Sequence, residues 1–229
     1  MGVTKVMIIR HAEKPGLYPV VTGLQYNGIN PFGEPDAESL VTMGWERAGA
    51  LVGLFYPSNN IFQNAELAAP DYIYAASPAF KMVAQANGNI EQKEPSQRPY
   101  QTISALYARM QMPATNLNIS FEDTDFASMV SSVLALPISS GTVLIAWQHQ
   151  DILLKPVSTK NPNPDSIVNE LLKQTNTPLT SLNIPANPWP QDRYDMVFVF
   201  DRPSGTGPFT AFTQVPQMLL AGDIPTPIS

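Results

Sequence analysis

Val6-Met7-Ile8-Ile9-Arg10-His11 is the stretch that decides the fold, because an apolar run here ends in an arginine and a histidine. A second apolar run, residues 142–147, ends two residues before His149, the only other histidine of the chain. Runs this rich in Val and Ile are typical of strands buried on both faces of a parallel sheet. Residues just past the carboxyl ends of such strands gather in one crevice. We therefore expect His11 and His149 to share a site, and the planar donor fork of Arg10 predicts an anionic ligand there.

The rest of the chain alternates strand patterns with helix patterns. Further strands are expected over residues 72–76, 116–119, 195–200 and 211–215, the last as an edge strand. Helices are expected from Ser39 to Pro57, from Pro99 onward, over 121–136 and 165–174, and near His149 until Pro156 interrupts it. Two segments without a period, 16–38 and 77–97, are predicted as long loops. Alternating strands and helices, without a repeat or a linker, predict one α/β layered domain.

Composition narrows the class of protein. With 229 residues and 44% apolar side chains, the chain can bury the core of one large domain. The net charge of -6 argues against a general nucleic-acid surface. The chain has no cysteine, which excludes disulfides, thiolate chemistry and cysteine-based zinc sites. No apolar run approaches the roughly 20 residues that span a membrane, and residues 1–5 lack the features of a secretory signal, so we expect a soluble, cytoplasmic protein.

Five short motifs, in order along residues 4–151, resemble the landmarks of the histidine phosphatase superfamily, which is also called phosphoglycerate mutase-like. The motifs are Arg10-His11-Ala12-Glu13-Lys14-Pro15, Leu40-Val41-Thr42-Met43-Gly44-Trp45-Glu46-Arg47-Ala48, Ile73-Tyr74-Ala75-Ala76-Ser77-Pro78, Arg98-Pro99-Tyr100-Gln101-Thr102 and the run from Val143 to His149. Each motif is modest, and the ordered combination is specific. The resemblance implies a single-domain three-layer αβα fold over residues 1–229, with a mostly parallel central sheet. Loop insertions are expected at 16–38 and 78–97, and the second is a departure from the family, which commonly passes from its Ser-Pro turn to the next arginine within a few residues.

The same resemblance implies a phosphatase that hydrolyses a phosphomonoester through a phosphohistidine. His11 would be the nucleophile, Arg10 and Arg98 would hold the phosphoryl oxygens, and His149 would donate a further hydrogen bond. The Arg/His cluster would supply the positive charge, so no metal or cofactor is expected. Positive charge around the phosphate would also lower the pKa of His11 and keep its imidazole neutral for attack. The expected partner is a small phosphate ester or another phosphorylated substrate, without nucleic acid or membrane.

The leaving alcohol needs a proton, which a carboxyl group with a raised pKa could supply. Glu122 is the first choice because it follows the short predicted strand 116–119. Asp123, Asp125, Asp151 and Glu13 remain alternatives. Acids at 122–125 could instead be favourable charges at a helix N-terminus, and Glu13 could form a surface pair with Lys14.

Other functions stay open at this point. Arg98, at the end of an irregular segment, could be an ordinary solvated arginine. A phosphomutase would share the same core site, and a metal hydrolase could use His11, His149 and a carboxylate, although the spacing of the two histidines does not favour it. A phosphate-binding module that has lost turnover is the non-enzymatic alternative. The sequence does not identify the physiological substrate or the oligomeric state.

Overall fold

The computed structural model describes residues 2–16, 27–84, 89–137, 141–153 and 165–229. The described residues form a six-stranded sheet in the order β5-β2-β6-β1-β7-β8. The strands are β1 (Val3–Arg10), β2 (Tyr72–Ala75), β5 (Leu117–Asn118), β6 (Gly141–Trp147), β7 (Met196–Asp201) and β8 (Ala211–Pro216). Neighbours from β5 to β1 pair in parallel, whereas β7 pairs antiparallel with β1 and with β8. The predicted strands and the mixed α/β class with a central sheet are thus confirmed, including β8 as an edge strand.

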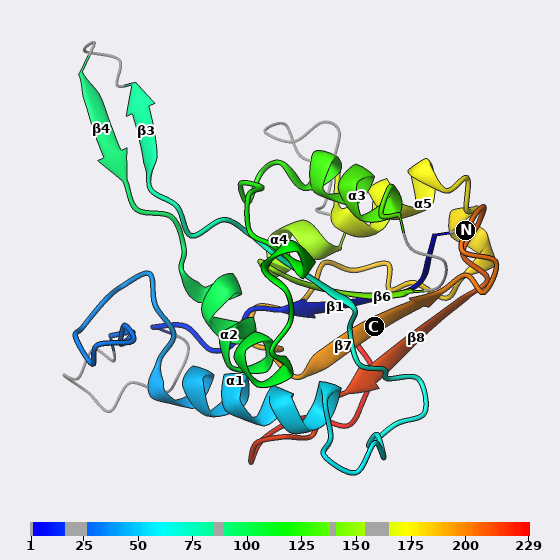
Figure 1. The fold of residues 1–229 in the computed structure, drawn as a ribbon, viewed down its shortest axis with the longest axis horizontal. Coiled ribbons are helices and arrows are strands. Elements are labelled where there is room, and N and C mark those ends of the chain that lie inside the picture. The colour runs from blue at the N-terminus through cyan, green and yellow to red at the C-terminus, as the bar shows by residue number, and fades with distance from the viewer. Residues whose placement is uncertain (1, 17–26, 85–88, 138–140, 154–164) are drawn as a thin grey trace.

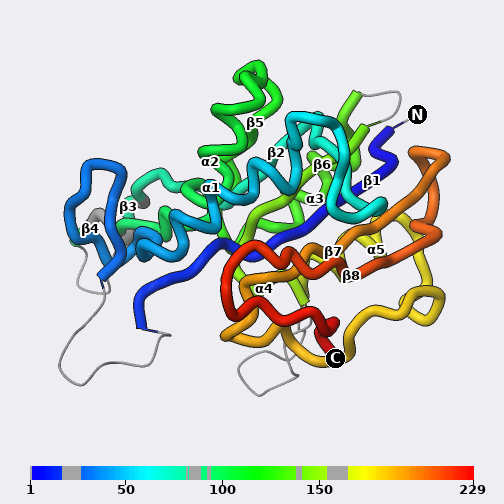
Figure 2. Tube along the Cα trace, turned by 90° about the horizontal axis from the view of Figure 1, so that it is seen from below, coloured from blue at the N-terminus to red at the C-terminus, as the bar shows by residue number. Residues whose placement is uncertain are grey.

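Helices pack against both faces of this sheet (Figure 1). Helices α1 (Thr42–Phe55) and α2 (Arg98–Met110) contribute to one buried apolar cluster. Helices α3 (Phe126–Leu134), α4 (His149–Ile152) and α5 (Ile167–Gln174) contribute to the other. Two short 3₁₀ turns, Ala114–Asn116 and Leu179–Ser181, complete the helical elements of the described ranges. Viewed from below, the Cα trace shows β1, β7 and β8 running side by side, in the order of the sheet (Figure 2).

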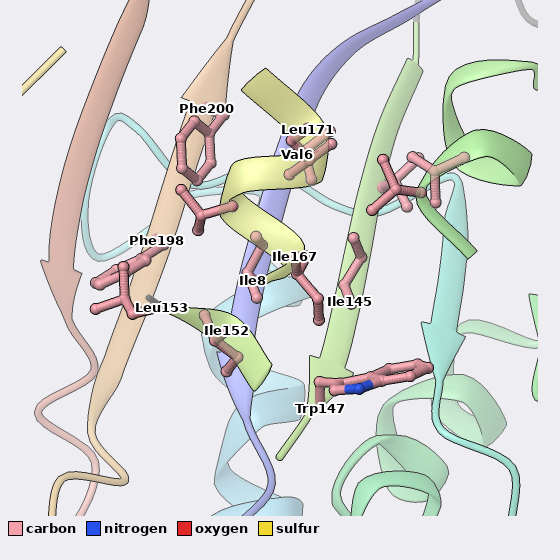
Figure 3. Close-up of a cluster of buried hydrophobic side chains, with 14 of the residues drawn as sticks. Val6, Ile8, Ile145, Trp147, Ile152, Leu153, Ile167, Leu171, Phe198 and Phe200 are labelled. Carbon is pink, nitrogen blue, oxygen red and sulfur yellow. The ribbon is translucent and has the colours of Figure 1, made fainter. Parts of the chain in front are cut away.

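Strand β1 is buried on both faces, which explains why its sequence does not alternate between apolar and polar residues. Val6 and Ile8 point into one cluster, and Met7 and Ile9 point into the other, so both faces of the strand are dry. Figure 3 shows Val6 and Ile8 among side chains from α4, α5, β6 and β7. Complete burial of each such side chain contributes about 1.5–3 kcal/mol. This core holds β1 rigidly, and with it the residues that follow its carboxyl end.

Strands β1 and β6 end level with each other. Arg10 is paired in register with Trp147, and the backbone N–H of His11 donates to the Trp147 carbonyl at 2.8 Å. The ladder therefore continues by one bond beyond the strand ends. The two histidine-bearing segments leave the sheet at the same edge, as expected from the sequence.

Two predicted helices begin later than expected. Residues 39–41 are not helical, because the Leu40 carbonyl accepts from the Ile29 N–H at 2.8 Å, and α1 begins only at Thr42. Residues 121–123 are tied to the sheet, since the Phe121 carbonyl accepts from the Ser77 N–H and the Asp123 carbonyl accepts from the Trp147 indole. Helix α3 therefore begins only at Phe126. In both places a tertiary hydrogen bond competes successfully with helix formation.

The segment 77–97 is not an irregular loop throughout. It contains an antiparallel hairpin, β3 (Lys81–Ala84) with β4 (Ile90–Lys93), which projects away from the sheet in Figure 1. The side chains of Met82 and Ile90 are 71% and 67% exposed. Residues 17–26 of the predicted first loop, and Pro156 with most of 154–165, lie outside the described residues.

In the part of the chain that the structure describes, no helix combines the length and the apolar character that crossing a bilayer requires.

Candidate functional site

Arg10, the last residue of β1, is fixed by one of its terminal nitrogens. Its side chain is 1% exposed, and Nη1 donates to the backbone carbonyls of Gln191 at 2.6 Å, Arg193 at 3.1 Å and Pro190 at 3.3 Å. Nε and Nη2 are also buried, and they have no hydrogen-bond partner among the described residues. These two nitrogens form one edge of the guanidinium, which matches two oxygens of a phosphate or carboxylate group. The fixed side chain thus presents a vacant bidentate donor edge.

His11 is held in one tautomer. Its ring is buried, and Nδ1 lies 2.7 Å from the Ala12 carbonyl oxygen. A carbonyl only accepts hydrogen bonds, so Nδ1 carries the proton and Nε2 carries the lone pair. Burial lowers the pKa of His11 well below 6.5, and the positive charges of Arg10, Arg98 and Lys14 lower it further. The imidazole is therefore neutral near neutral pH and has a lone pair on Nε2, and burial is the largest cause of its lowered pKa.

Arg98 begins α2 and reaches back to the segment before α1. Nη1 donates to the Ala37 carbonyl at 2.9 Å, and Nη2 forms an ion pair with Glu38 at 3.2 Å. Its side chain is 14% exposed, and Nε is buried with no partner within the described ranges. Burial lowers the pKa of Arg98 from 12.5, against the effect of Glu38. The interpretation as an ordinary solvated arginine is therefore wrong, and one donor remains open.

His149 is the first residue of α4 and is buried. It follows β6 by two residues, directly beside the end of β1, so it lies at the same sheet edge as His11. Asp151, also buried, lies in the same short helix. The structure thus brings Arg10, His11 and His149 to one edge from adjacent strands. Arg98 joins them electrostatically from α2, because its charge lowers the pKa of His11.

Helix α2 also holds the loop that follows His11. The Ala12 N–H donates to the hydroxyl oxygen of Thr102 at 2.8 Å, and that hydroxyl donates to the Arg98 carbonyl at 2.8 Å. Gln101 binds the segment before α1 through the Leu40 N–H and the Ser39 hydroxyl. The Arg-x-x-Gln-Thr motif therefore consists of one cation and two side chains that position backbone around the site.

Glu13 lies inside the protein rather than on its surface. Its side chain is 2% exposed, and Oε1 accepts from Nε and Nη2 of Arg47 at 2.8 Å and 2.7 Å. Arg47 also pairs with Asp223 at 2.7 Å. The surface pair of Glu13 with Lys14 was therefore the wrong interpretation. Helix α1 approaches this loop closely, because a Cβ on Gly44 would lie 2.6 Å from the Glu13 carbonyl oxygen.

The other candidate acids differ in their surroundings. Asp123 accepts from the Gln148 side chain at 2.8 Å, next to the end of β6. Glu122, its exposed neighbour, lies before α3 rather than in its first turn. Asp125 is the N-cap residue of α3, although its side chain makes no capping bond. Of the acids at 122–125, only Asp125 therefore lies at the N-terminus of α3, as a charge favourable to the helix would.

Tyr194 and the carbonyls of 190–193 are functional groups that sequence reasoning missed. The guanidinium carbon of Arg10 lies 3.7 Å from the centroid of the Tyr194 ring, whose own centroid is 6.2 Å from that of the His11 ring. Every residue has a backbone carbonyl, so the sequence gives no sign of which carbonyls accept hydrogen bonds from Arg10. The available signal was the position of Tyr194, two residues before a strand that pairs antiparallel with β1.

Comparison with known proteins gives only distant structural neighbours. No family model matches the chain, and no curated protein matches it. One similar solved structure is described as a candidate phosphohistidine phosphatase SixA from Agrobacterium tumefaciens, with 14% identity, a TM-score of 0.35, and coverage of 87% of this chain and 92% of that one. Another, of the same description, from Nakamurella multipartitia, has 12% identity, a TM-score of 0.38, and coverage of 92% and 95%.

Both neighbours belong to the histidine phosphatase superfamily. Likeness at such identities and TM-scores carries no argument about the activity of this chain. Across the described ranges, His, Asp and Glu side chains form no group of three or more that could hold a metal ion.

Proposed function

We propose that this chain is a metal-independent phosphatase of the histidine phosphatase superfamily, which hydrolyses a phosphomonoester through a phosphohistidine on His11. The observation that carries the proposal is the pairing of a fixed neutral imidazole, with Nε2 free of the proton, and the vacant donor edge of Arg10 next to it. The helices on both faces of the sheet support a single three-layer αβα domain over residues 1–229 of the phosphoglycerate mutase-like type.

The first step is transfer of the phosphoryl group to His11. Nε and Nη2 of Arg10, Nε of Arg98 and the His149 ring bind the phosphoryl oxygens. Nε2 of His11 attacks phosphorus, the bond from phosphorus to the ester oxygen breaks, and the alcohol leaves with a proton from a carboxyl group.

In the second step, a water molecule attacks the phosphohistidine, loses a proton to the same carboxylate and releases inorganic phosphate. The covalent intermediate divides one difficult displacement into two easier ones.

Positive charge at the site serves both steps. Phosphoryl transfer depends mainly on positioning and on stabilising charge on the equatorial oxygens. Loss of one preorganised donor of this kind typically costs about 100- to 1,000-fold in rate. The same charges disfavour protonation of His11, so the nucleophile is in its reactive form without a separate base.

Glu122 is the carboxyl group that we propose as the proton donor. Asp125 lies at the helix N-terminus. Glu122 is exposed, and its neighbour Asp123 accepts through its carbonyl from the Trp147 indole at the end of β6, which supports this choice. Asp151, in the same short helix as His149, is the second choice.

The proposed substrate is a small phosphomonoester in the cytoplasm, with no role for nucleic acid or membrane. A phosphate-binding module without turnover is the alternative, because its donor cluster would be the same and only the acid would be lost. A phosphomutase differs only in the acceptor, which would be a second alcohol in place of water.

Hydrolysis of p-nitrophenyl phosphate, with and without a chelator, tests the proposal. We expect turnover that the chelator leaves unchanged and that His11→Ala abolishes, while the exposed-site variant Glu46→Gln retains it. Quenching with alkali during turnover should trap phosphate on His11, because the phosphorus–nitrogen bond of a phosphohistidine is stable in base and labile in acid. Turnover by His11→Ala equal to that of the unmodified chain would overturn the phosphohistidine mechanism, and phosphate binding without any turnover would favour the module.

A matched pair of esters tests the acid. Glu122→Gln should slow ethyl phosphate at least about tenfold more than p-nitrophenyl phosphate, because an alkoxide leaving group needs a proton more than a phenolate does. Asp125→Asn, three residues away, serves as the control and should affect both esters little. Equal slowing of the two esters by Glu122→Gln would mean that Glu122 is not the proton donor, and Asp151 would then be the candidate to test.

A further inference from the structure

A partly open hollow of about 150 Å³ lies between α1, residues 192–195 and the turn 220–223. Its volume is roughly five times the ~30 Å³ that one water molecule occupies in the liquid. The polar side chains that line it are Glu13, Arg47, Asp192, Tyr194, Asp195 and Asp223. The hollow therefore has room for a small organic group and offers it a mostly acidic wall.

Two buried oxygen atoms of this wall lack a hydrogen-bond partner within the described residues. One is Oε2 of Glu13, whose other oxygen is bonded to Arg47. The second is the hydroxyl of Tyr194, which has the backbone amide of Lys14 nearby. A buried polar atom without a partner costs about 1–3 kcal/mol. Both residues line the hollow, so a group bound there can supply what they lack.

Apart from the tyrosine hydroxyl, the polar atoms of the wall that remain available for hydrogen bonding belong to negatively charged carboxylates. Asp195 is occupied by Arg193 at 2.7 Å, and Asp223 by Arg47 and the Leu219 N–H, each at 2.7 Å. Glu13 keeps one free oxygen, and Asp192 is exposed at the rim. A group that fits must therefore donate hydrogen bonds, and a positive charge on it would be favoured by the carboxylates around it.

The hollow shares a wall with the anion site. Tyr194 lines the hollow, and its ring lies under the Arg10 guanidinium. Glu13 is two residues from His11, and Glu13 and Asp192 both lie close enough to Arg10 to favour its charged form. The hollow and the anion site are therefore adjacent, and Tyr194 belongs to both.

We propose that the hollow is a subsite for a primary ammonium group on the leaving alcohol, so that the substrate is a zwitterionic phosphomonoester of a short amino alcohol. The proposal rests on the proposed phosphatase activity. An ammonium group has three donors and a positive charge, and it fits Oε2 of Glu13 and the oxygen of Tyr194, which can accept. Charge separation across the shared wall would then orient the ester, with its anion toward Arg10 and its cation toward Glu13.

Matched esters test the subsite. We expect kcat/KM for 2-aminoethyl or 3-aminopropyl phosphate to exceed that for ethyl phosphate at least about tenfold. Glu13→Gln and Asp192→Asn should each remove most of this preference while ethyl phosphate is still hydrolysed. Glu46→Gln, which removes an exposed carboxylate elsewhere on α1, should retain the preference. Because Glu13→Gln also weakens a buried ion pair, the exposed Asp192 provides a variant that does not threaten folding.

A binding measurement separates the two proposals. Ethanolamine alone should raise the thermal midpoint of the unmodified chain but not that of Asp192→Asn. If neither ester turns over, the phosphatase proposal fails, and ethanolamine binding alone then decides the subsite. If both esters turn over equally well and ethanolamine at about 100 mM shifts nothing, the hollow holds only water and the subsite proposal is overturned.

Discussion

The guanidinium of Arg10 lies over the ring of Tyr194, with 3.7 Å between its central carbon and the ring centroid. The carbonyls of Pro190, Gln191 and Arg193 accept from one side of the same guanidinium, so the ring and the backbone fix it together. Burial alone would oppose the charge, and it lowers the pKa of Arg10 to about 10 despite the nearby acids. Arg10 therefore stays charged at neutral pH in a fixed orientation, which is the condition for binding an anion on its vacant edge.

Replacement of Tyr194 separates its ring from its hydroxyl. Tyr194→Leu should weaken inhibition by inorganic phosphate about 3- to 30-fold, because a desolvated cation–π contact contributes roughly 0.5–2 kcal/mol. Tyr194→Phe keeps the ring and should bind phosphate as the unmodified chain does. The measurement is the inhibition constant of phosphate against p-nitrophenyl phosphate. Equal weakening in both variants would mean that the ring does not support Arg10.

The Thr102 hydroxyl should matter for both stability and rate. Thr102→Val keeps the volume but leaves the Ala12 N–H without its acceptor, at a cost of about 1–3 kcal/mol in the free energy of unfolding. The loop after His11 would then shift, so kcat should fall. Thr102→Ser retains the hydroxyl and should keep most of kcat. Urea unfolding and initial rates, measured together, check this, and a fully active Thr102→Val protein would contradict it.

Gly44 and Gly49 form a matched pair on α1. A Cβ at Gly44 would lie 2.6 Å from the Glu13 carbonyl oxygen, whereas at Gly49 nothing lies within 4 Å. Gly44→Ala should therefore lower the free energy of unfolding by about 1–3 kcal/mol. Gly49→Ala should raise it by roughly 0.5–1 kcal/mol, because alanine favours the helix. Thermal unfolding of both variants distinguishes a close helix approach from a general effect of glycine replacement.

The sequence predicted what depends on local pattern. The apolar run before Arg10 indicated a strand covered on both faces. Residues that follow parallel strands meet at one edge of the sheet, so the shared location of His11 and His149 could be predicted. The resemblance to a family added Arg98, whose segment alone would have indicated a solvated side chain.

What the sequence did not predict depends on long-range contacts. Glu13 was misinterpreted because its partner, Arg47, lies 34 residues away, and the third member of the cluster, Asp223, lies at the other end of the chain. The hairpin in 77–97 was missed although Asn87-Gly88 is a strong turn signal between its strands. The support of Arg10 by carbonyls has no signature in any side chain, so only the folded chain reveals it.

The pH dependence of stability should report the buried neutral state of His11. Its folded pKa lies well below 6.5, mainly because of burial, whereas in the unfolded chain it is near 6.5. Below pH 6.5 the unfolded chain therefore binds more protons than the folded protein, so stability falls as the pH falls toward the folded pKa. Above pH 6.5 this contribution is fully present. Urea unfolding of the unmodified chain and of His11→Asn between pH 5 and 7 measures it, because the variant lacks this titration and should lose less stability on acidification. Equal losses in the two proteins would mean that His11 is accessible to protons in the folded state, and the neutral nucleophile would then require another explanation.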